Sequence, residues 1–116
     1  MTDCIFCKII NNELPSDAVL ENEYVKVIKD INPKAPLHLV IIAKSEKHIP
    51  SIKEVSVSDK ELLTAMILAA QQIAAKNSLK GYKLVFNVGR EGGQMIDHLH
   101  LHLLGGWGST THQVNV

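Results

Sequence analysis

The sequence carries no net charge and has no long apolar run. Twelve Lys and Arg residues balance twelve Asp and Glu residues, so no overall field favours nucleic acid or an anionic membrane. The longest uncharged stretch, 62–75, is too short to span a bilayer and contains Thr64, Gln71 and Gln72. The opening residues, MTDC, include an acid where a secretory signal needs basic residues before an apolar segment. We therefore expect a cytoplasmic protein that binds neither nucleic acid nor a membrane.

Cysteine is scarce, since only Cys4 and Cys7 occur. In a reducing compartment such a pair is more typical of metal binding or redox chemistry than of a structural disulfide. A thioredoxin-like pair would follow a strand, but only three residues precede Cys4. Two interpretations stay open. One is a pair of buried thiols without a function, and the other is half of a tetrahedral Cys₂His₂ zinc site, which needs two histidines nearby.

The 116 residues, 46% of them hydrophobic, suit one globular domain without a repeat or a linker. The patterning predicts a short helix in CIFCKII and a long one in 58–77, with Ser58 and Glu61 as its capping box. One apolar stripe marks the buried face of the long helix: Leu62, Met66, Ala69, Ala70 and Ile73. Strands are predicted at 24–31, at 37–44, at 82–88 and in DHLHLHLL. This order of elements indicates an α+β domain with an antiparallel sheet.

Three of the six histidines, His98, His100 and His102, fall in the stretch DHLHLHLLGG. Alternate side chains of a strand point to opposite faces, so the three imidazoles share one face and the leucines between them share the other. The leucine face is expected in the core, and the two glycines end the strand. A polar row on a half-buried sheet remains to be explained.

The row admits three interpretations. Solvated surface histidines would explain one imidazole, but not three in register with a fourth, His38, on another strand. A metal site could use His98 and His100 with an open position for water. His98 and His102, however, lie about 13 Å apart at about 3.3 Å per residue, so one histidine would have no role.

The third interpretation, in which one histidine is a nucleophile, gives all three histidines a role. An imidazole with a pKa of about 6.5 is about three-quarters neutral at pH 7 and can attack without a separate strong base. The middle histidine, His100, has a neighbour on each side to neutralise phosphate oxygens and protonate a leaving group. The glycine-rich GREGGQM before the row offers unhindered backbone N–H groups to a phosphate. Together these features point to phosphoryl chemistry.

The motif His-φ-His-φ-His-φ-φ, where φ is apolar, occupies residues 98–104 and resembles the signature of the histidine triad (HIT) superfamily. The stretches IFCKIINNELPSDAVLENEYVKVIKDINPKAPLHLVIIAK and LVFNVGREGGQMIDHLHLHLLGG are similar to the bacterial histidine triad nucleotide-binding proteins. We expect one domain over 1–116, with a core at 4–106 and a tail at 107–116. The resemblance implies a HIT-like α+β fold: a five-stranded antiparallel sheet, one long and one short helix, and a homodimer whose sheets join.

The activity that the resemblance implies is hydrolysis of purine nucleoside 5′-phosphoramidates, such as adenosine 5′-monophosphoramidate and aminoacyl adenylates, through a nucleotidyl-histidine. His100 matches the nucleophile, and His102 matches the histidine that contacts the phosphate and the departing amine. His38 and His98 match the remaining members of the proton relay. Asp30 matches the carboxylate that bonds the ribose hydroxyls. The other residues expected to contact a purine nucleotide of the AMP or GMP type are Phe6, Ile28, Ile31, Asn87, Gly93, Gln94 and Met95.

Met95 departs from the family pattern, because well-known members carry a phosphate-facing serine there. A methionine cannot donate a hydrogen bond as the serine does, so the difference puts in doubt how the leaving group is protonated, and not the activity itself. His102 argues against the nucleotidyltransferase branch, which has glutamine at that position. The short chain and GGQ favour phosphoramidases over dinucleoside polyphosphate hydrolases. Those hydrolases remain an alternative, as does a nucleotide-binding interaction protein with vestigial catalysis.

Some bacterial relatives are similar in binding zinc with a Cys₂His₂ set, which here would be Cys4, Cys7, His48 and His98. The resemblance implies one structural zinc ion per chain, clamping the N-terminal helix to the sheet. His98 would then serve the metal and could not shuttle a proton freely.

Overall fold

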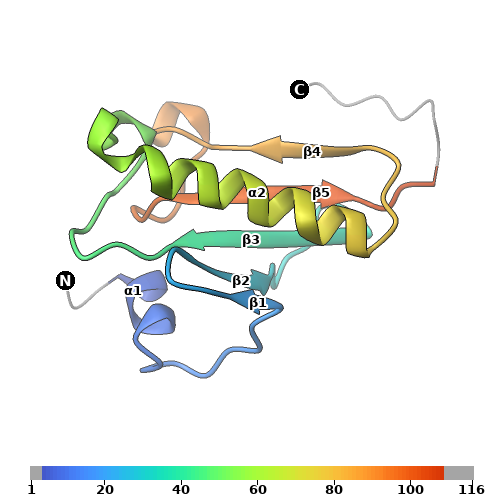
Figure 1. The fold of residues 1–116 in the computed structure, drawn as a ribbon, viewed down its shortest axis with the longest axis horizontal. Helices are drawn as coiled ribbons and strands as arrows, with labels where there is room; N and C mark the ends of the chain where they lie inside the picture. The colour runs from blue at the N-terminus through green and yellow to red at the C-terminus, as the bar shows by residue number, and fades with distance from the viewer. Residues whose placement is uncertain (1–3, 109–116) are drawn as a thin grey trace.

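The computed structural model describes residues 4–108, which form one five-stranded antiparallel sheet with helices (Figure 1). The strand order is β1-β2-β3-β5-β4, so β5 is an inner strand and β4 an edge. The strands are β1 (Leu20–Glu21), β2 (Val25–Lys29), β3 (Leu37–Ala43), β4 (Tyr82–Val85) and β5 (His100–Gly105). The helices are α1 (Ile5–Ile10) and α2 (Lys60–Lys76), with 3₁₀ turns η1 (Ile52–Glu54), η2 (Val57–Asp59) and η3 (Arg90–Gly92). The expected fold class is confirmed, while positions 109–116 of the expected tail lie outside the described residues.

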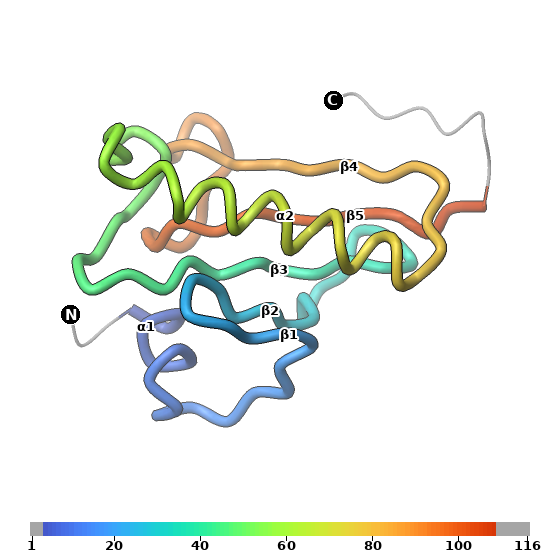
Figure 2. Tube along the Cα trace, in the orientation of Figure 1, coloured from blue at the N-terminus to red at the C-terminus, as the bar shows by residue number. Residues whose placement is uncertain are grey.

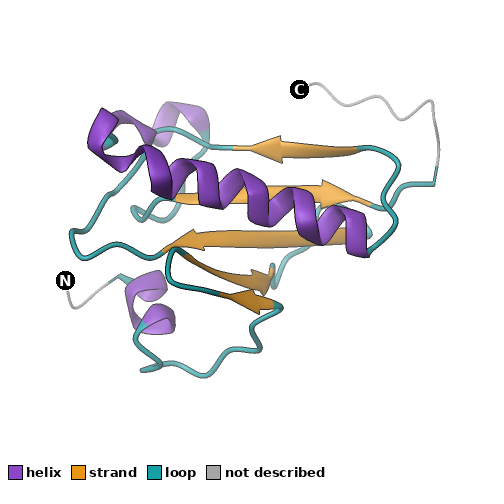
Figure 3. Cartoon of the chain, viewed as in Figure 1, coloured by secondary structure: helices purple, strands orange, loops and turns teal. Residues whose placement is uncertain are grey.

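Helix α2 lies along one face of the sheet (Figures 1 and 3). All five residues of the predicted stripe are buried, and Ala74 is buried as well. They share one hydrophobic cluster with Leu99, Leu101 and Leu103, none of which is more than 1% exposed. The leucine face of the histidine segment is therefore core, as the period of two predicts.

Helix α1 covers part of the opposite face, where Cys4, Phe6 and Ile9 pack against Val40 and Ile42 of β3. Figure 2 shows α1 at the same end of the sheet as the loop between β4 and β5 and the connection between β3 and α2. Strand β5 begins at this end. Three segments that are far apart in the sequence therefore converge on the first residues of β5.

The strands are shorter than predicted. Strands β2, β3 and β4 end at Lys29, Ala43 and Val85, each before the predicted boundary. Strand β5 begins at His100, so His98 precedes the regular strand instead of lying within it. Strand β1 has no counterpart among the elements predicted from the residues, because two residues provide no periodicity.

The predicted capping box at Ser58 and Glu61 is wrong by two residues. Ser56 and Asp59 form the box, at the start of the turn η2. This 3₁₀ turn continues directly into α2, which begins at Lys60 and has no side-chain cap of its own. The preceding turn explains the shift, because the first orphan N–H groups belong to η2 and not to α2.

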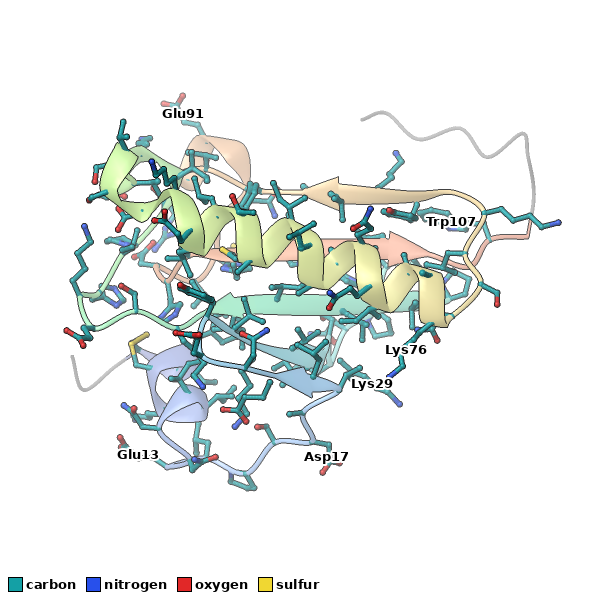
Figure 4. All side chains as sticks on the ribbon, viewed as in Figure 1. Glu13, Asp17, Lys29, Lys76, Glu91 and Trp107 are labelled. Carbon is teal, nitrogen blue, oxygen red and sulfur yellow. A yellow bond between two sulfur atoms is a disulfide. The ribbon has the colours of Figure 1, made fainter. Side chains whose placement is uncertain are left out.

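Most charged side chains lie at the surface of the molecule, and Lys26, which is 3% exposed, is an exception. Figure 4 shows Glu13, Asp17, Lys29, Lys76 and Glu91 pointing away from the sheet. Among the described residues, no helix combines the length and the hydropathy that a membrane span requires.

Candidate active site

Strands β3 and β5 carry the site histidines on the face that α2 leaves open. The register places His100 opposite Ile42 and His102 opposite Val40. Directly opposite residues of an antiparallel pair share a face. Val40 and Ile42 pack against α1, so the imidazoles of His100 and His102 lie on the α1 side. His38 is one further pair along, and its ring contacts that of His102 at a centroid distance of 5.1 Å.

The flanking strands add two of the expected nucleotide contacts to this face. On β2, Ile28 lies opposite Val40, and the backbone N–H of Asp30 donates to the carbonyl of His38 at 3.0 Å. On the other side, Val85 of β4 lies opposite His102. Asn87, another expected nucleotide contact, follows two residues after Val85, beyond the end of regular pairing.

The tautomer of His100 is fixed by the backbone carbonyl of His98. Its Nδ1–H donates to the carbonyl oxygen of His98 at 2.6 Å, so Nε2 carries the lone pair. The edge of the Phe6 ring meets the imidazole at a centroid distance of 5.0 Å and an interplanar angle of 81°. Burial lowers the pKa of His100, against the opposing effects of the His98 carbonyl and the Asp30 charge. A neutral imidazole with a free Nε2 is the form that attacks phosphorus.

His38 and His102 form a directed hydrogen-bond chain. The backbone N–H of Lys34 donates to Nδ1 of His38 at 3.0 Å, which leaves the proton of neutral His38 on Nε2. That Nε2–H donates to Nδ1 of His102 at 2.9 Å, so the proton of neutral His102 lies on its own Nε2. Burial, aided by the charges of His100 and His38, lowers the pKa of His102 to about 4. His102 therefore presents an N–H donor where His100 presents a lone pair.

Asp30, His38 and His102 place three ligand atoms within 4.8 Å of one another, a spacing that a metal ion could bridge. The hydrogen bonds argue against such a site. A metal at His38 Nε2 would force the proton onto Nδ1, which already accepts from the Lys34 N–H. The carboxylate of Asp30 lies 3.5 Å from His38 Nε2. This set is built to orient protons, with Asp30 at its outer end.

The glycine-rich loop is shaped by Gln94, which is 2% exposed. Its Nε2 donates to the carbonyls of Pro50 (2.7 Å) and Ile96 (2.8 Å), and its Oε1 accepts from the N–H of Gly89 (2.9 Å). The side chain is thus fully engaged with the backbone. Any contact that this part of the loop makes with a nucleotide falls to main-chain groups, with Gly93 in the left-handed conformation at φ +85°.

Arg90 and Asp97 close the base of the same loop. The guanidinium donates to both carboxylate oxygens at 2.9 Å, and Nη1 also reaches the carbonyl of Gln94 at 2.6 Å. The sequence analysis did not predict this ion pair. Opposite charges on both sides of GREGGQMID were its only signal, and a separation of seven residues has no fixed meaning in a loop.

The remaining predicted nucleotide contacts differ in exposure. Phe6 is buried against the row and Ile28 is partly buried in the α1 cluster. Ile31 and Met95 are 92% and 82% exposed. Exposed apolar side chains such as these are available to a flat apolar ligand such as a purine.

Cys4, Cys7, His48 and His98 form a second cluster beside the row. Their ligand atoms all lie within 4.8 Å of one another. Nε2–H of His98 donates to the carbonyl of Ala43 at 2.8 Å, so its Nδ1 lone pair faces both sulfurs, each 3.3 Å away. Nδ1 of His48 lies 3.5 Å from the Cys7 sulfur. The donor set therefore fits a Cys₂His₂ metal site, and in this structure the two sulfurs lie at disulfide distance.

Comparisons with known proteins agree with this geometry. Residues 3–112 match the family model "Scavenger mRNA decapping enzyme C-term binding". The chain is 42% identical over 106 residues to the purine nucleoside phosphoramidase of Escherichia coli K12, covering 90% of this chain and 87% of that protein. Protein HitA of Neisseria gonorrhoeae is also 42% identical, over 90% of this chain and 97% of its own.

Solved structures show the same fold. A HIT family hydrolase from Clostridium thermocellum superposes with a TM-score of 0.88 at 42% identity, covering 100% of this chain and 99% of its own. A HIT family hydrolase from Legionella pneumophila gives a TM-score of 0.84 at 45% identity, over 90% and 93% of the two chains. With the histidine row, the sheet and these relatives in agreement, the chain belongs to the histidine triad (HIT) family of hydrolases.

Proposed function

We propose that this hydrolase cleaves purine nucleoside 5′-phosphoramidates through a nucleotidyl intermediate on His100. The observation that carries the proposal is the pair of opposite tautomers. His100 offers the Nε2 lone pair, while His102 beside it offers Nε2–H. The relative named purine nucleoside phosphoramidase supports the choice of substrate class.

The reaction proceeds in two displacements. Nε2 of His100 attacks the α-phosphorus, and the electron pair of the P–N bond moves to nitrogen, which takes the Nε2 proton of His102 and leaves as an amine. At the same time the Nε2 proton of His38 passes to Nδ1 of His102, and a proton from solvent replaces it on His38, so that no imidazolate forms. Water then attacks phosphorus, the bond to His100 breaks, and the proton released by water replaces the one that solvent supplied. Backbone N–H groups of the glycine-rich loop and the side chain of Asn87 would hold the phosphoryl oxygens. Asp30 would accept hydrogen bonds from the ribose hydroxyls, with Phe6, Ile28 and Ile31 around the base.

Trapping the intermediate tests this mechanism. Intact mass spectrometry after brief mixing with adenosine 5′-monophosphoramidate should show an adenylyl adduct on the wild-type chain and none on His100→Ala. Steady turnover without any adduct, retained by His100→Ala, would rule the covalent route out.

We further propose that Cys4, Cys7, His48 and His98 hold one structural zinc ion per chain. The ion would supply cross-linking between α1, the connection between β3 and α2, and the start of β5. His98 would orient its Nδ1 toward the ion through its bond to Ala43. Its carbonyl would continue to fix the tautomer of His100.

We propose, last, that the chain acts in the cytoplasm as a homodimer joined through the edge strand β4. Unpaired edges are rarely left open in stable proteins. Tyr82 and Leu84 of β4 are 38% and 39% exposed, and Ile67 and Leu68 of α2 are 47% and 46% exposed. Leu84 lies opposite the core residue Leu103, so it is on the same side of the sheet as α2. A second sheet added at β4 would cover this apolar margin.

A further inference from the structure

We propose that Cys4 and Cys7 form a site of reversible oxidation, at which a small-molecule disulfide converts the dithiolate metal clamp into a Cys4–Cys7 disulfide and expels the ion. This inference rests on the proposed zinc site and is independent of the phosphoramidase activity. The two states exclude each other, because a disulfide leaves neither sulfur as the thiolate that a metal requires.

The two states differ in which parts of the chain they connect. A metal bound by the four side chains links Cys7 to His48, 41 positions away, and to His98, 91 positions away. A Cys4–Cys7 disulfide joins residues only three positions apart, at the N-terminal end of α1. Oxidation therefore replaces a cross-link between three segments with a link inside one turn. Closing the long loops constrains the chain far more than closing the short one.

The sulfurs are placed for thiol–disulfide exchange. Cys7 is partly exposed, whereas Cys4 is 9% exposed and caps α1 by accepting from the Cys7 N–H at 3.1 Å. The Cys7 thiolate attacks one sulfur of oxidised glutathione, forming a mixed disulfide and releasing one glutathione thiolate. The Cys4 thiolate then attacks the Cys7 sulfur and releases the second. Two protein thiolates lose two electrons, the reagent gains two, and the metal ion departs without changing charge.

The Cys₂His₂ cluster is connected to His100, the proposed nucleophile, in two ways. Phe6 lies between the cysteines and meets both His98 (6.0 Å) and His100 (5.0 Å) with its ring edge on. The carbonyl of His98 holds the Nδ1–H of His100. Losing the ion thus frees the end of α1 that carries Phe6.

The other end of α1 has its own anchor. Lys26 is 3% exposed, and its Nζ donates to the carbonyl of Ile9 at 3.0 Å and to Oδ1 of Asn12 at 3.1 Å. This anchor contains no sulfur or metal ligand and is untouched by oxidation. We therefore expect α1 to loosen at its first turn and stay attached at its last.

The experiment compares metal content, covalent state and local order in the same samples. Reduced protein loaded with Zn²⁺ is titrated with oxidised glutathione, without substrate. Released zinc is measured with a chromogenic chelator, disulfide formation by intact mass, and amide exchange over residues 5–10 by mass spectrometry. We expect one ion released per disulfide formed, about tenfold faster exchange in the first turn of α1, and recovery on adding dithiothreitol and Zn²⁺.

Two variants separate the metal from the disulfide. Cys7→Ser cannot form the disulfide. The zinc that this variant binds before oxidation, even if less than one ion per chain, should stay bound when oxidised glutathione is added. His48→Gln keeps both thiols, lacks one ligand, and should show the fast exchange of α1 before any oxidant is added. A disulfide that forms while zinc stays bound, or zinc release without faster exchange of α1, would overturn the proposal. Reduced wild-type protein that binds no zinc would overturn the zinc site and this inference together, and would leave the phosphoramidase proposal standing.

Discussion

At the scale of single residues, His100 and His102 present different groups because different partners hold their Nδ1 atoms. A backbone carbonyl accepts from Nδ1 of His100, whereas the Nε2–H of His38 donates to Nδ1 of His102. The first arrangement exposes a lone pair and the second a proton. The proposed nucleophile and the proposed proton donor thus lie two residues apart, with ring centroids 5.0 Å from each other.

Replacing the two histidines in turn should separate their proposed duties. We expect His100→Ala to abolish turnover of adenosine 5′-monophosphoramidate while binding AMP nearly as tightly as wild type, because the pocket remains. His102→Ala should retain some activity, with kcat reduced about 10²–10⁴-fold, since water can partly replace a proton donor. Steady-state kinetics and AMP titration by calorimetry provide both numbers. Equal losses of kcat in the two variants would contradict the division of duties.

The depressed pKa of His102 makes a prediction about stability. Burial holds this pKa at about 4 in the folded chain, against about 6.5 when unfolded. Between these values the unfolded chain binds more protons, so the free energy of unfolding should fall as the pH is lowered from about 6.5 toward 4. The slope of the unfolding free energy against pH is proportional to the number of extra protons that the unfolded chain binds. His102→Gln should lower this number by up to about one in this window. Urea unfolding with chelator present, which removes metal loss as a cause, measures the slope, and identical slopes would contradict the assignment.

The sequence predicted which residues meet and missed how they are oriented. Alternation in DHLHLHLL placed the imidazoles opposite the leucine core, and the Cys₂His₂ cluster that the resemblance implied is brought together. Main-chain groups of Lys34, Ala43 and His98 fix the tautomers. All residue types carry a backbone carbonyl and all but proline a backbone N–H, so no residue pattern could reveal which groups would serve. For His98, Nδ1 faces the cysteines and Nε2 is bound to Ala43, an arrangement that favours the proposed metal role over the proton relay.

At the scale of elements, the loop between β4 and β5 depends on Gln94 for its shape. Its amide nitrogen serves two carbonyls, a task that a carboxylate cannot perform. We expect Gln94→Glu to lower the free energy of unfolding by about 1–3 kcal/mol and to weaken AMP binding, because two buried acceptors lose their donors.

Glu91→Gln is the matched control, since it makes the reverse change at an exposed position of the same loop, visible at the rim of the molecule in Figure 4. It should leave stability within about 0.5 kcal/mol of wild type. Chemical denaturation of both variants measures the effect. A Gln94→Glu variant as stable as its control would show that the loop does not rely on this amide.

The elements themselves were predictable to different degrees. Helix α2 has a long apolar period and was found with its buried face, although its cap lies in the preceding turn η2. Strand β1 is fixed by pairing with β2, at Leu20–Val27 and Glu21–Lys26, and not by a pattern of its own. Strand β4 stops at Val85 because the chain then turns into the glycine-rich loop. Tertiary pairing decides such ends, and local sequence does not contain it.

At the scale of the whole molecule, the candidate active site lies one strand away from the sheet edge formed by β4. Val85 of β4 lies opposite His102, and the chain continues from β4 through Asn87 into the loop that borders the row. Pairing of β4 with a second copy would therefore support both sites at once. The monomer should keep its α2 core but hold Asn87 and the loop less firmly.

Leu84→Lys tests this arrangement, because a lysine on an edge strand disfavours pairing without touching the interior of the monomer. We expect wild type to sediment as a dimer at micromolar concentration and Leu84→Lys as a monomer, with helix content unchanged and kcat/KM reduced at least about tenfold. Val57→Lys, which alters an 83% exposed apolar residue on η2, is the control and should remain dimeric and active. A monomeric wild type, or a Leu84→Lys chain that still forms dimers, would contradict joining at β4. A monomeric Leu84→Lys with full activity would instead show that each chain completes its own site, and the link between the edge strand and the histidine row would have to be abandoned.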